Sequence, residues 1–395
     1  MKDIVIVDGA RTPFGTFMGS LKGFTATELG VIAARAALER AKIDPASVDG
    51  VVFGNVLQTS PDAIYLARHI GLKAGAPIET PALTVNRLCG SGLEAIVQGA
   101  RLIQLGEAAV VLAGGAENMS QAPHQIYGAR DGLALGQGQL VDYLWASLVD
   151  SYNQLGMALT TENLVEKYGI SREESDEFAL RSHQLAAAAQ DAGRLAEEIV
   201  PVELKDRKGN VTLFAHDEHV RRDVSAEKMA GLSARFKKGG TVTPGNASGI
   251  NDGAAAVVLM SREQAEAENR EPLGRLVAWG TSGVHPDIMG IGPAPSSRQA
   301  LQRAGLTLAD IDVVEINEAF AGQYLAVERE LGLDRAKVNL NGGGVAIGHP
   351  LAASGARLTV ATLYELRRRG GRYGLLSMCI GGGQGIAAVV ENLQR

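Results

Sequence analysis

Asp49-Gly-Val-Val-Phe-Gly-Asn55 and Asp312-Val-Val-Glu-Ile-Asn317 are two similar apolar runs, and each reads as a buried strand that ends at an asparagine. Around each run, short apolar stretches alternate with helical patterns, over residues 2–115 in the first case and from residue 273 onward in the second. This alternation is typical of an α/β protein. Because both stretches follow the same order, we interpret the chain as a duplication of two α/β halves that face each other.

The pattern predicts corresponding elements in the two halves. In the first half we expect strands at 4–7, 51–53, 83–85 and 109–113, and helices at 27–41 and from Cys89 to about 105. In the second half we expect strands at 276–279, 313–316, 338–340, 373–378 and 386–390, and helices at 297–304 and 352–369. The helix after Cys89 then corresponds to the helix after His349.

The alternation stops between residues 117 and 245. One helix is predicted there, over residues 171–192, because Ser171-Arg-Glu-Glu174 forms a capping box at its start. The remainder reads as long loops, which usually cover or bind something. Residues 203–238 hold nine Lys or Arg against six Asp or Glu. This local excess of positive charge suggests an anionic ligand such as a phosphorylated cofactor, with a solvated surface as the alternative.

Composition excludes several classes of protein. A net charge of -6 over 395 residues argues against broad nucleic-acid binding, and no apolar stretch reaches the ~20 residues of a membrane helix. Two cysteines are too few for a disulfide framework or a zinc site of four thiolates. His216 and His219 flank Asp217-Glu218, but their loop-like segment does not indicate a metal site. The sequence starts with a strand pattern and no basic leader, so we expect a cytoplasmic location.

Both cysteines open onto glycine turns, Cys89-Gly-Ser-Gly92 and Cys379-Ile-Gly-Gly-Gly383, whose NH groups can approach a substrate. Cys89 stands where a predicted strand meets a helix, and a helix N-terminus favours a thiolate and supplies donors for an oxyanion. We therefore predict that Cys89 is a nucleophile, although a lone cysteine in apolar surroundings is more often inert. A second thiol at Cys379 suits proton transfer, because one covalent intermediate needs one nucleophile.

Two further polar groups stand at glycine turns or strand ends. His349, in Gly348-His-Pro350, is placed to act as a base or a hydrogen-bond donor. Asn317 follows a predicted strand, and its neutral amide can hold a water molecule or an oxyanion.

Five motifs follow one another along the chain: Val85-Asn-Arg-Leu-Cys-Gly-Ser-Gly92, Gly245-Asn-Ala-Ser-Gly-Ile-Asn-Asp-Gly253, Asn317-Glu-Ala-Phe320, Gly348-His-Pro350 and Cys379-Ile-Gly-Gly-Gly-Gln-Gly385. Together they resemble the thiolase family, the acetyl-CoA acetyltransferases and 3-ketoacyl-CoA thiolases. The resemblance spans essentially the whole chain, and five motifs in family order are far more specific than any one of them.

The resemblance implies a five-layered α-β-α-β-α fold of two duplicated halves with an inserted loop domain. We expect the first half to cover residues 1–117, completed by about 246–270, and the second half to cover residues 271–395. Residues 118–245 would form the loop domain that holds coenzyme A.

Carried over position by position, the resemblance makes Cys89 the acylated nucleophile and His349 the group that activates it. Cys379 would be the acid or base that moves the α-proton. Asn317 would orient a water molecule that stabilises an enolate oxygen together with His349. The backbone NH groups of Cys89 and Gly381 would form a second oxyanion hole.

The activity implied by the resemblance is acyl transfer between coenzyme A thioesters, by thiolytic cleavage of 3-ketoacyl-CoA and by the reverse Claisen condensation of acetyl-CoA. Coenzyme A and acyl-CoA are then substrates, no cofactor is tightly bound, and the chain forms a homodimer or homotetramer. The family pattern places coenzyme A at six positions: Ser248, Met157, Arg221, Phe236, Ala319 and Phe320.

Departures from the family pattern at Gly156, Pro244 and Gly344 affect the acyl and cofactor pockets rather than the reacting groups. Asp62-Ala-Ile-Tyr-Leu-Ala-Arg-His69 and Gln323-Tyr-Leu-Ala-Val-Glu328 resemble the degradative, β-oxidation branch of the family. We therefore favour thiolysis of short or medium acyl chains.

Two other functions fit parts of the pattern. A decarboxylating ketoacyl synthase also uses a cysteine nucleophile on a duplicated fold, but it would place a histidine at the position of Cys379. A non-catalytic acyl-CoA-binding or redox-sensing protein would use Cys89 and Cys379 as a reversible disulfide.

Overall fold

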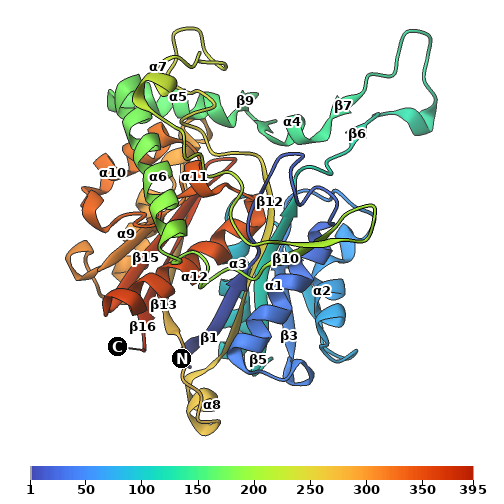
Figure 1. Ribbon diagram of the computed structural model, residues 1–395, viewed down its shortest axis with the longest axis vertical. Helices are drawn as coiled ribbons and strands as arrows, with labels where there is room; N and C mark the ends of the chain where they lie inside the picture. Colours follow the sequence, from blue (N-terminus) through green and yellow to red (C-terminus); the bar gives the residue numbers. More distant parts are fainter. Residues whose placement is uncertain (1, 395) are drawn as a thin grey trace.

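The computed structural model describes residues 2–394, and one large mixed sheet runs through its centre (Figure 1). Its main strands are β1 Ile4–Arg11, β3 Gly50–Gly54, β4 Ala82–Val85, β5 Val110–Asn118, β12 Asn251–Ser261, β13 Gly274–Gly283, β14 Val313–Ile316, β15 Tyr373–Ile380 and β16 Gln384–Asn392. They lie in the order β14-β15-β16-β13-β1-β12-β5-β3-β4, and the short β2 (Gly15–Thr16) pairs with β12.

This strand order confirms the duplication. β3 runs parallel to β5 in the first half, and β14 runs parallel to β15 in the second. β1 and β13 are antiparallel to each other, with Ile4 opposite Leu276, and this pair joins the two halves into one sheet. On either side of that pair the strands follow the same sequence, β1-β12-β5-β3 in one half and β13-β16-β15-β14 in the other.

Helices complete the five layers that the resemblance implied. α1 (Ala26–Ala41) and α2 (Leu66–Ala74) cover the outer face of the first half. α9 (Pro293–Ala304) and α10 (Ala321–Leu331) cover the outer face of the second. α3 (Ser91–Leu105) and α12 (Leu351–Arg369) lie between the halves, where their apolar side chains share one core with both parts of the sheet (Figure 1).

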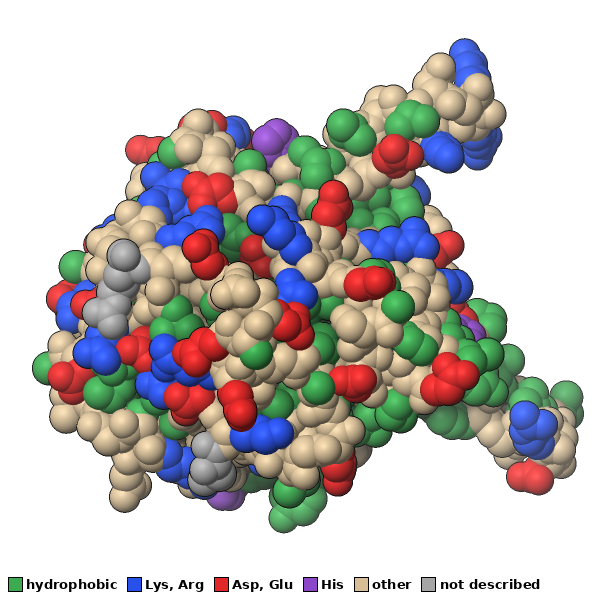
Figure 2. Space-filling view, turned by 90° about the horizontal axis from the view of Figure 1, so that it is seen from below, with side chains coloured by type: hydrophobic (Ala, Val, Ile, Leu, Met, Phe, Trp, Pro, Cys, Tyr) green, Lys and Arg blue, Asp and Glu red, His purple; other side chains and the backbone are tan. Residues whose placement is uncertain are grey.

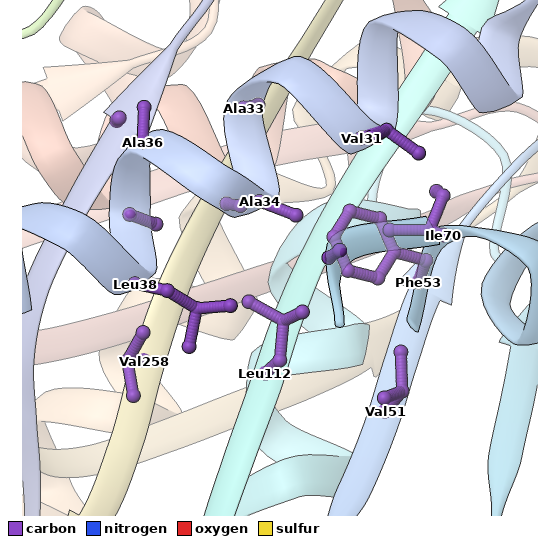
Figure 3. Packing of buried hydrophobic residues seen from close by; sticks show 14 of the residues in the cluster. Val31, Ala33, Ala34, Ala36, Leu38, Val51, Phe53, Ile70, Leu112 and Val258 are labelled. Carbon is purple, nitrogen blue, oxygen red and sulfur yellow. The ribbon is translucent and has the colours of Figure 1, made fainter. Parts of the chain in front are cut away.

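α1 shows why these helices form and pack as they do. A capping box between Thr25 and Glu28 begins the helix, as the polar residues before an apolar run suggest. The buried face is built largely of alanine, and Figure 3 shows Leu38 lying close to Leu112 and Val258 of the sheet below. Full burial of one such leucine contributes ~2 kcal/mol.

Glycines allow the two central helices to approach each other and the sheet. A Cβ atom on Gly92 would lie 2.3 Å from the carbonyl oxygen of Ala352, and one on Gly355 would lie 2.3 Å from the backbone nitrogen of Leu93. A Cβ atom on Gly115 of β5 would lie 1.9 Å from the same Ala352 oxygen. Since these contacts are with backbone atoms, only hydrogen fits at the three positions. The first turns of α3 and α12 are therefore held side by side.

Most predicted elements are present, but the expected strand at 338–340 is wrong. Only a single bridge between Val314 and Val338 remains there. The next residue, Asn339, has a φ of 47°, and its side-chain amide bonds both the NH and the carbonyl of Ile316. This side chain replaces the backbone ladder that a strand would have made.

The middle of the chain contains more structure than the predicted loops. α6 (Arg172–Asp191) begins at the predicted capping box between Ser171 and Glu174. A second helix, α5 (Met157–Tyr168), was not predicted. Its buried face includes Thr161 and Glu162, which obscure the apolar period, and Glu162 accepts hydrogen bonds from the backbone NH groups of residues 241 and 242.

Short elements fill the rest of the described chain: β6 His124–Gln125, β7 Val141–Asp142, β8 Val149–Asp150, β9 Leu155–Gly156, β10 Val202–Lys205, β11 Val211–Phe214, α4 Tyr143–Ser147, α7 Ala226–Ala230, α8 Arg262–Ala267 and α11 Gly344–Ile347. The segment around β6 and β7, residues 120–142, projects from the body and is called the arm below (Figure 1). The space-filling view shows that projections extend beyond the compact body (Figure 2). Across residues 2–394, no helix has both the length and the apolar character to span a membrane.

Candidate active site

Cys89 lies in the tight connection between β4 and α3. Leu88 adopts a left-handed conformation with φ 46°, and the hydroxyl of Ser91 accepts from the NH of Arg87 and donates to the carbonyl of Leu88. These contacts turn the chain sharply, as the glycine-rich sequence predicted. A Cβ atom on Gly90 would lie 2.7 Å from the Cδ1 atom of Ile380, so the turn packs directly on the second half.

Two backbone NH groups lie near the thiol of Cys89, that of Gly381 and its own, and both favour its ionised form. Burial nevertheless raises the pKa of Cys89 to about 11, against the effect of these donors. The resting group is therefore a neutral thiol, not the thiolate that a helix N-terminus alone would favour. Gly381 itself packs near Leu88 and the sulfur of Met157.

His349 stands between α11 and α12, and Gly348 before it has a φ of 110°, which favours glycine. The backbone NH of His349 donates to Oδ1 of Asn251 over 3.0 Å. Burial, together with the charge of Arg357, lowers the pKa of His349 to about 3. The imidazole is thus neutral at physiological pH and available to accept a proton.

Asn317 follows β14 as predicted and meets His349 across the site. Its Nδ2 atom lies 3.3 Å from Nε2 of His349. Its Oδ1 atom is buried and makes no hydrogen bond within the described part of the chain. Such an acceptor is normally satisfied by a water molecule or a ligand.

Cys379 is the penultimate residue of β15 and is fully buried, and both cysteines are free thiols. Burial raises the pKa of Cys379, and the neighbouring thiol of Cys89 adds to this effect because ionisation of one thiol disfavours ionisation of the other. Ala319 and Phe320 pack in the same small apolar cluster as Cys379. The structure thus brings Cys89, Cys379 and the turn at Gly381 together, at the start of the two central helices.

Two family models match this chain, the N-terminal domain of thiolase over residues 4–263 and the C-terminal domain of thiolase over residues 270–392. The chain belongs to the thiolase family. The mitochondrial 3-ketoacyl-CoA thiolase of Homo sapiens is 53% identical over 99% of this thiolase and 99% of its own length, and its crystal structure superposes with a TM-score of 0.97.

Bacterial relatives are almost as similar. Beta-ketothiolase BktB from Cupriavidus necator is 52% identical over 99% of this thiolase and 100% of its own chain. The crystal structure of the Bacillus anthracis acetyl-CoA acetyltransferase is 48% identical, covers 100% of this thiolase and 99% of its own chain, and has a TM-score of 0.97.

These relatives confirm the predicted family, fold class and enzyme class. The thiolase is an acyltransferase that cleaves 3-ketoacyl-CoA thiolytically and carries out the reverse condensation of acetyl-CoA. Neither the ketoacyl synthase nor the non-catalytic alternative is supported, since the relatives are thiolases along their whole length.

The cytoplasmic location predicted from the sequence is wrong. The relatives from Homo sapiens, Pongo abelii and Bos taurus, at 53%, 53% and 52% identity, are named mitochondrial. The prediction used the strand pattern at the start of the sequence. β1 does begin at Ile4, but a strand there carries no information about the compartment.

The six positions expected to contact coenzyme A fall into two groups in the thiolase. Met157, Ala319 and Phe320 pack with Cys379, and Ser248 is tied to them because its NH donates to the carbonyl of Ala319 over 2.9 Å. The other two, Arg221 and Phe236, lie on exposed stretches of the middle segment.

The acidic residues of the middle segment that lie between His216 and His219 serve other contacts. Asp217 forms a buried ion pair with Arg11 of β1, and Glu218 bonds Thr16 and Ser20. Over residues 2–394, no group of three or more histidine, cysteine or carboxylate side chains is arranged to hold a metal ion.

Sequence reasoning missed three residues that support the site. Asn251 holds the backbone of His349, and Ser354 contacts its ring. Glu117, at the end of β5, accepts from the NH groups of Leu57 and Ala352, which belong to opposite halves of the chain. Helical spacing, which places residue 354 one turn beyond the start of α12, was the one signal available for Ser354.

Proposed function

We propose that Cys89 carries the acyl group in the thiolase reaction and that Cys379 moves the α-proton. Two features carry this proposal: the Gly381 and Cys89 NH groups lie near the Cys89 thiol, and this half-buried thiol neighbours the buried thiol of Cys379. Two oriented donors at a carbonyl form an oxyanion hole, and losing one such donor costs ~3 kcal/mol of transition-state stabilisation.

In the cleavage direction, the thiol proton of Cys89 passes to Nε2 of His349 while sulfur attacks the keto carbon of the substrate. The bond between that carbon and the α-carbon then breaks, which leaves an acyl group on Cys89 and the enolate of acetyl-CoA. Cys379 gives its proton to the enolate carbon. Each step moves one proton between groups already on the site, so no external acid or base is needed.

The second half of the reaction restores the resting thiols. Coenzyme A gives its thiol proton to Cys379 and attacks the acyl carbon, and the departing sulfur of Cys89 recovers its proton from His349. During the enolate step, Nε2–H of His349 and a water molecule held by Asn317 stabilise the enolate oxygen. The free Oδ1 atom of Asn317 supports this role, because it can accept from a water molecule that donates its other proton to the enolate.

We propose that residues 118–245 form a loop domain that binds coenzyme A, between a first half of residues 1–117 and about 246–270 and a second half of residues 271–395. The contacts with coenzyme A would come from Met157, Arg221 and Phe236 of this domain, and from Ser248, Ala319 and Phe320 outside it. The apolar group around Cys379 supports a site for the thioester end, and the exposed Arg221 suits a phosphate. Coenzyme A and acyl-CoA act as substrates, with no tightly bound cofactor.

Short or medium 3-ketoacyl-CoA substrates, cleaved in β-oxidation, are the proposed physiological use. The names of the mammalian relatives support the degradative direction. Thiolysis rates across 3-ketoacyl-CoAs of increasing chain length test the preferred acyl length. Comparison with the rate of acetyl-CoA condensation tests the direction of the reaction. A faster rate of condensation than of thiolysis would contradict the proposed degradative direction.

A homodimer or homotetramer is the proposed assembly. β4 leaves an unpaired edge on the sheet with Leu83 exposed, and the arm exposes several large apolar side chains: Ile126, Tyr127, Leu133, Leu135 and Leu140. Exposed apolar surface and sheet edges of this kind are usually covered in an assembly. Light scattering that returned the mass of a single chain would contradict this assignment.

Two substitutions separate the proposed roles of the thiols. Cys89→Ala should abolish both acyl-enzyme formation and turnover. Cys379→Ser should still form the acyl-enzyme from acyl-CoA, while exchange of the carbon-carbon bond falls by ~10²-fold or more, the usual contribution of a general acid or base. Mass spectrometry measures the acyl-enzyme. Turnover in Cys89→Ala, or equal loss of both steps in Cys379→Ser, would contradict the assignments.

A further inference from the structure

Ser354 is a fully buried residue in the first turn of α12, and its hydroxyl contacts the ring of His349. The Oγ atom lies 2.5 Å from Nδ1 of the imidazole and 2.9 Å from the carbonyl oxygen of Pro350. The roles proposed above assign no task to this side chain. It nevertheless makes the only hydrogen bond of Nδ1 among the described residues.

The direction of these hydrogen bonds follows from counting protons. A serine hydroxyl has one proton, and the carbonyl of Pro350 can only accept. When the hydroxyl donates to Pro350, its oxygen must accept from Nδ1–H of His349. A neutral imidazole carries one proton, so Nε2 then presents a lone pair.

The other side of the ring agrees with this assignment. Nδ2 of Asn317, which can only donate, faces Nε2 of His349 at 3.3 Å. The hydrogen bonds therefore run in one direction, from Asn317 through the ring of His349 to Ser354 and the carbonyl of Pro350. The backbone of His349 is fixed independently, since its NH donates to Asn251, whose amide donates to the carbonyl of Gly15.

We propose that Ser354 is a positioning residue that selects the Nδ1–H tautomer of His349, an inference that rests on the proposed roles of Cys89 and His349. In this tautomer Nε2 has a lone pair that, on giving up its long 3.3 Å contact with Asn317, takes the proton as the S–H bond of Cys89 breaks and its sulfur bonds the acyl carbon. The ring then carries protons on both nitrogens, and the proton from Cys89 is the one that faces the enolate oxygen. One tautomer thus lets the same nitrogen act first as a base and then as a donor. With the other tautomer, Nε2 would have no lone pair.

Nitrogen-15 NMR of the histidine rings tests the tautomer without reference to activity. In the wild-type protein we expect the His349 signals, assigned by their loss in His349→Asn, to show a protonated Nδ1 and an unprotonated Nε2. In Ser354→Ala we expect a shift toward the protonated Nε2 form. Signals of the protonated Nε2 form in the wild-type protein would overturn the inference, even if the acyl-enzyme assignment stands.

Single-turnover acylation by acyl-CoA provides the second readout. Ser354→Ala should slow acylation by about 100-fold with little change in the acyl-CoA concentration that gives half the maximal rate. This is a smaller loss than the ~10⁴-fold seen where a charged partner sets a histidine tautomer. Ser354→Thr, which keeps a hydroxyl, should recover most of the rate.

The matched control is Thr359→Val, because the Thr359 hydroxyl makes the same type of helix back-bond, to Gly355, without contacting a histidine. Its acylation rate should stay within about threefold of wild type. Equal rates for Ser354→Ala and Thr359→Val would overturn the inference. Persistent turnover in Cys89→Ala would instead contradict the proposed function and leave the tautomer measurement valid.

Discussion

A methyl group at position 115 tests how the spacing of the layers sets the geometry of the site. The added Cβ atom of Gly115→Ala would lie 1.9 Å from the carbonyl oxygen of Ala352, whereas a normal contact between carbon and oxygen is about 3.3 Å. Because the partner is a backbone atom, no side-chain rotation relieves the clash. The first turn of α12 must therefore move by roughly 1.4 Å relative to β5.

His349 lies only three residues before Ala352, so we expect this shift to displace it against the hydrogen bond that its NH donates to Asn251. A displacement of ~1 Å in a catalytic group costs ~10²-fold in rate. We expect Gly115→Ala to lower kcat for thiolysis of a 3-ketoacyl-CoA about 100-fold, with a smaller change in KM for coenzyme A. Overpacking should also lower the free energy of unfolding by ~1–3 kcal/mol, which denaturant titration measures.

Gly23→Ala is the control, because a Cβ atom there would meet nothing within 4 Å. Its kcat and stability should match those of the wild-type enzyme. If kcat of Gly115→Ala were within twofold of that of Gly23→Ala, the close approach of β5 to α12 would not determine the position of His349, and the argument would fail.

Two further predictions concern buried charge. Burial raises the pKa of Glu117 to about 7 from an ordinary 4.5. Between these two pH values the folded state keeps a proton that the unfolded state loses. The free energy of unfolding therefore falls as pH rises from 4.5 to 7. Denaturant titrations should show the wild type losing ~3 kcal/mol relative to Glu117→Gln between pH 4.5 and 8, and parallel curves would contradict this. Arg11→Met leaves the buried carboxylates of Glu198 and Asp217 without their cation and should cost ~3–5 kcal/mol of unfolding free energy. Arg222→Met, which breaks an exposed ion pair, should cost less than ~1 kcal/mol, and equal losses would refute the distinction.

Periodicity and capping motifs predicted the helices and strands whose bounds are set by neighbouring residues in the sequence. β14 begins and ends at the predicted residues, and α6 begins at its predicted capping box. Both are decided by alternation or capping within a few residues. The duplication also anticipated that the helices after Cys89 and His349 would correspond, and they pack together in the middle layer.

Features that depend on distant contacts could not be predicted in this way. The side chain of Asn339 replaces a strand by bonding Ile316, and the polar buried face of α5 is matched by a loop more than seventy residues further along the chain. Ser354 and His349 are close in sequence, but the direction of the hydrogen bond between them depends on a third group. That group is the carbonyl of Pro350, which accepts the Ser354 proton. Periodicity reports which face of an element is buried and carries no information about which polar groups meet there.

The pairing of β1 has a consequence for how the chain reaches its fold during synthesis. Arg11 pairs with Ala255, and Ile4 pairs with both Ser261 and Leu276, so β1 has no partner strand until more than 240 further residues have been synthesised. At about 5–20 residues per second, this wait lasts roughly 10 to 50 s. During that time the apolar Ile4–Val7 segment is an unpaired strand in a nascent chain, and neither half can complete its core. Folding of this enzyme is therefore late and non-local, and β1 is an apolar segment that is exposed before its partners exist.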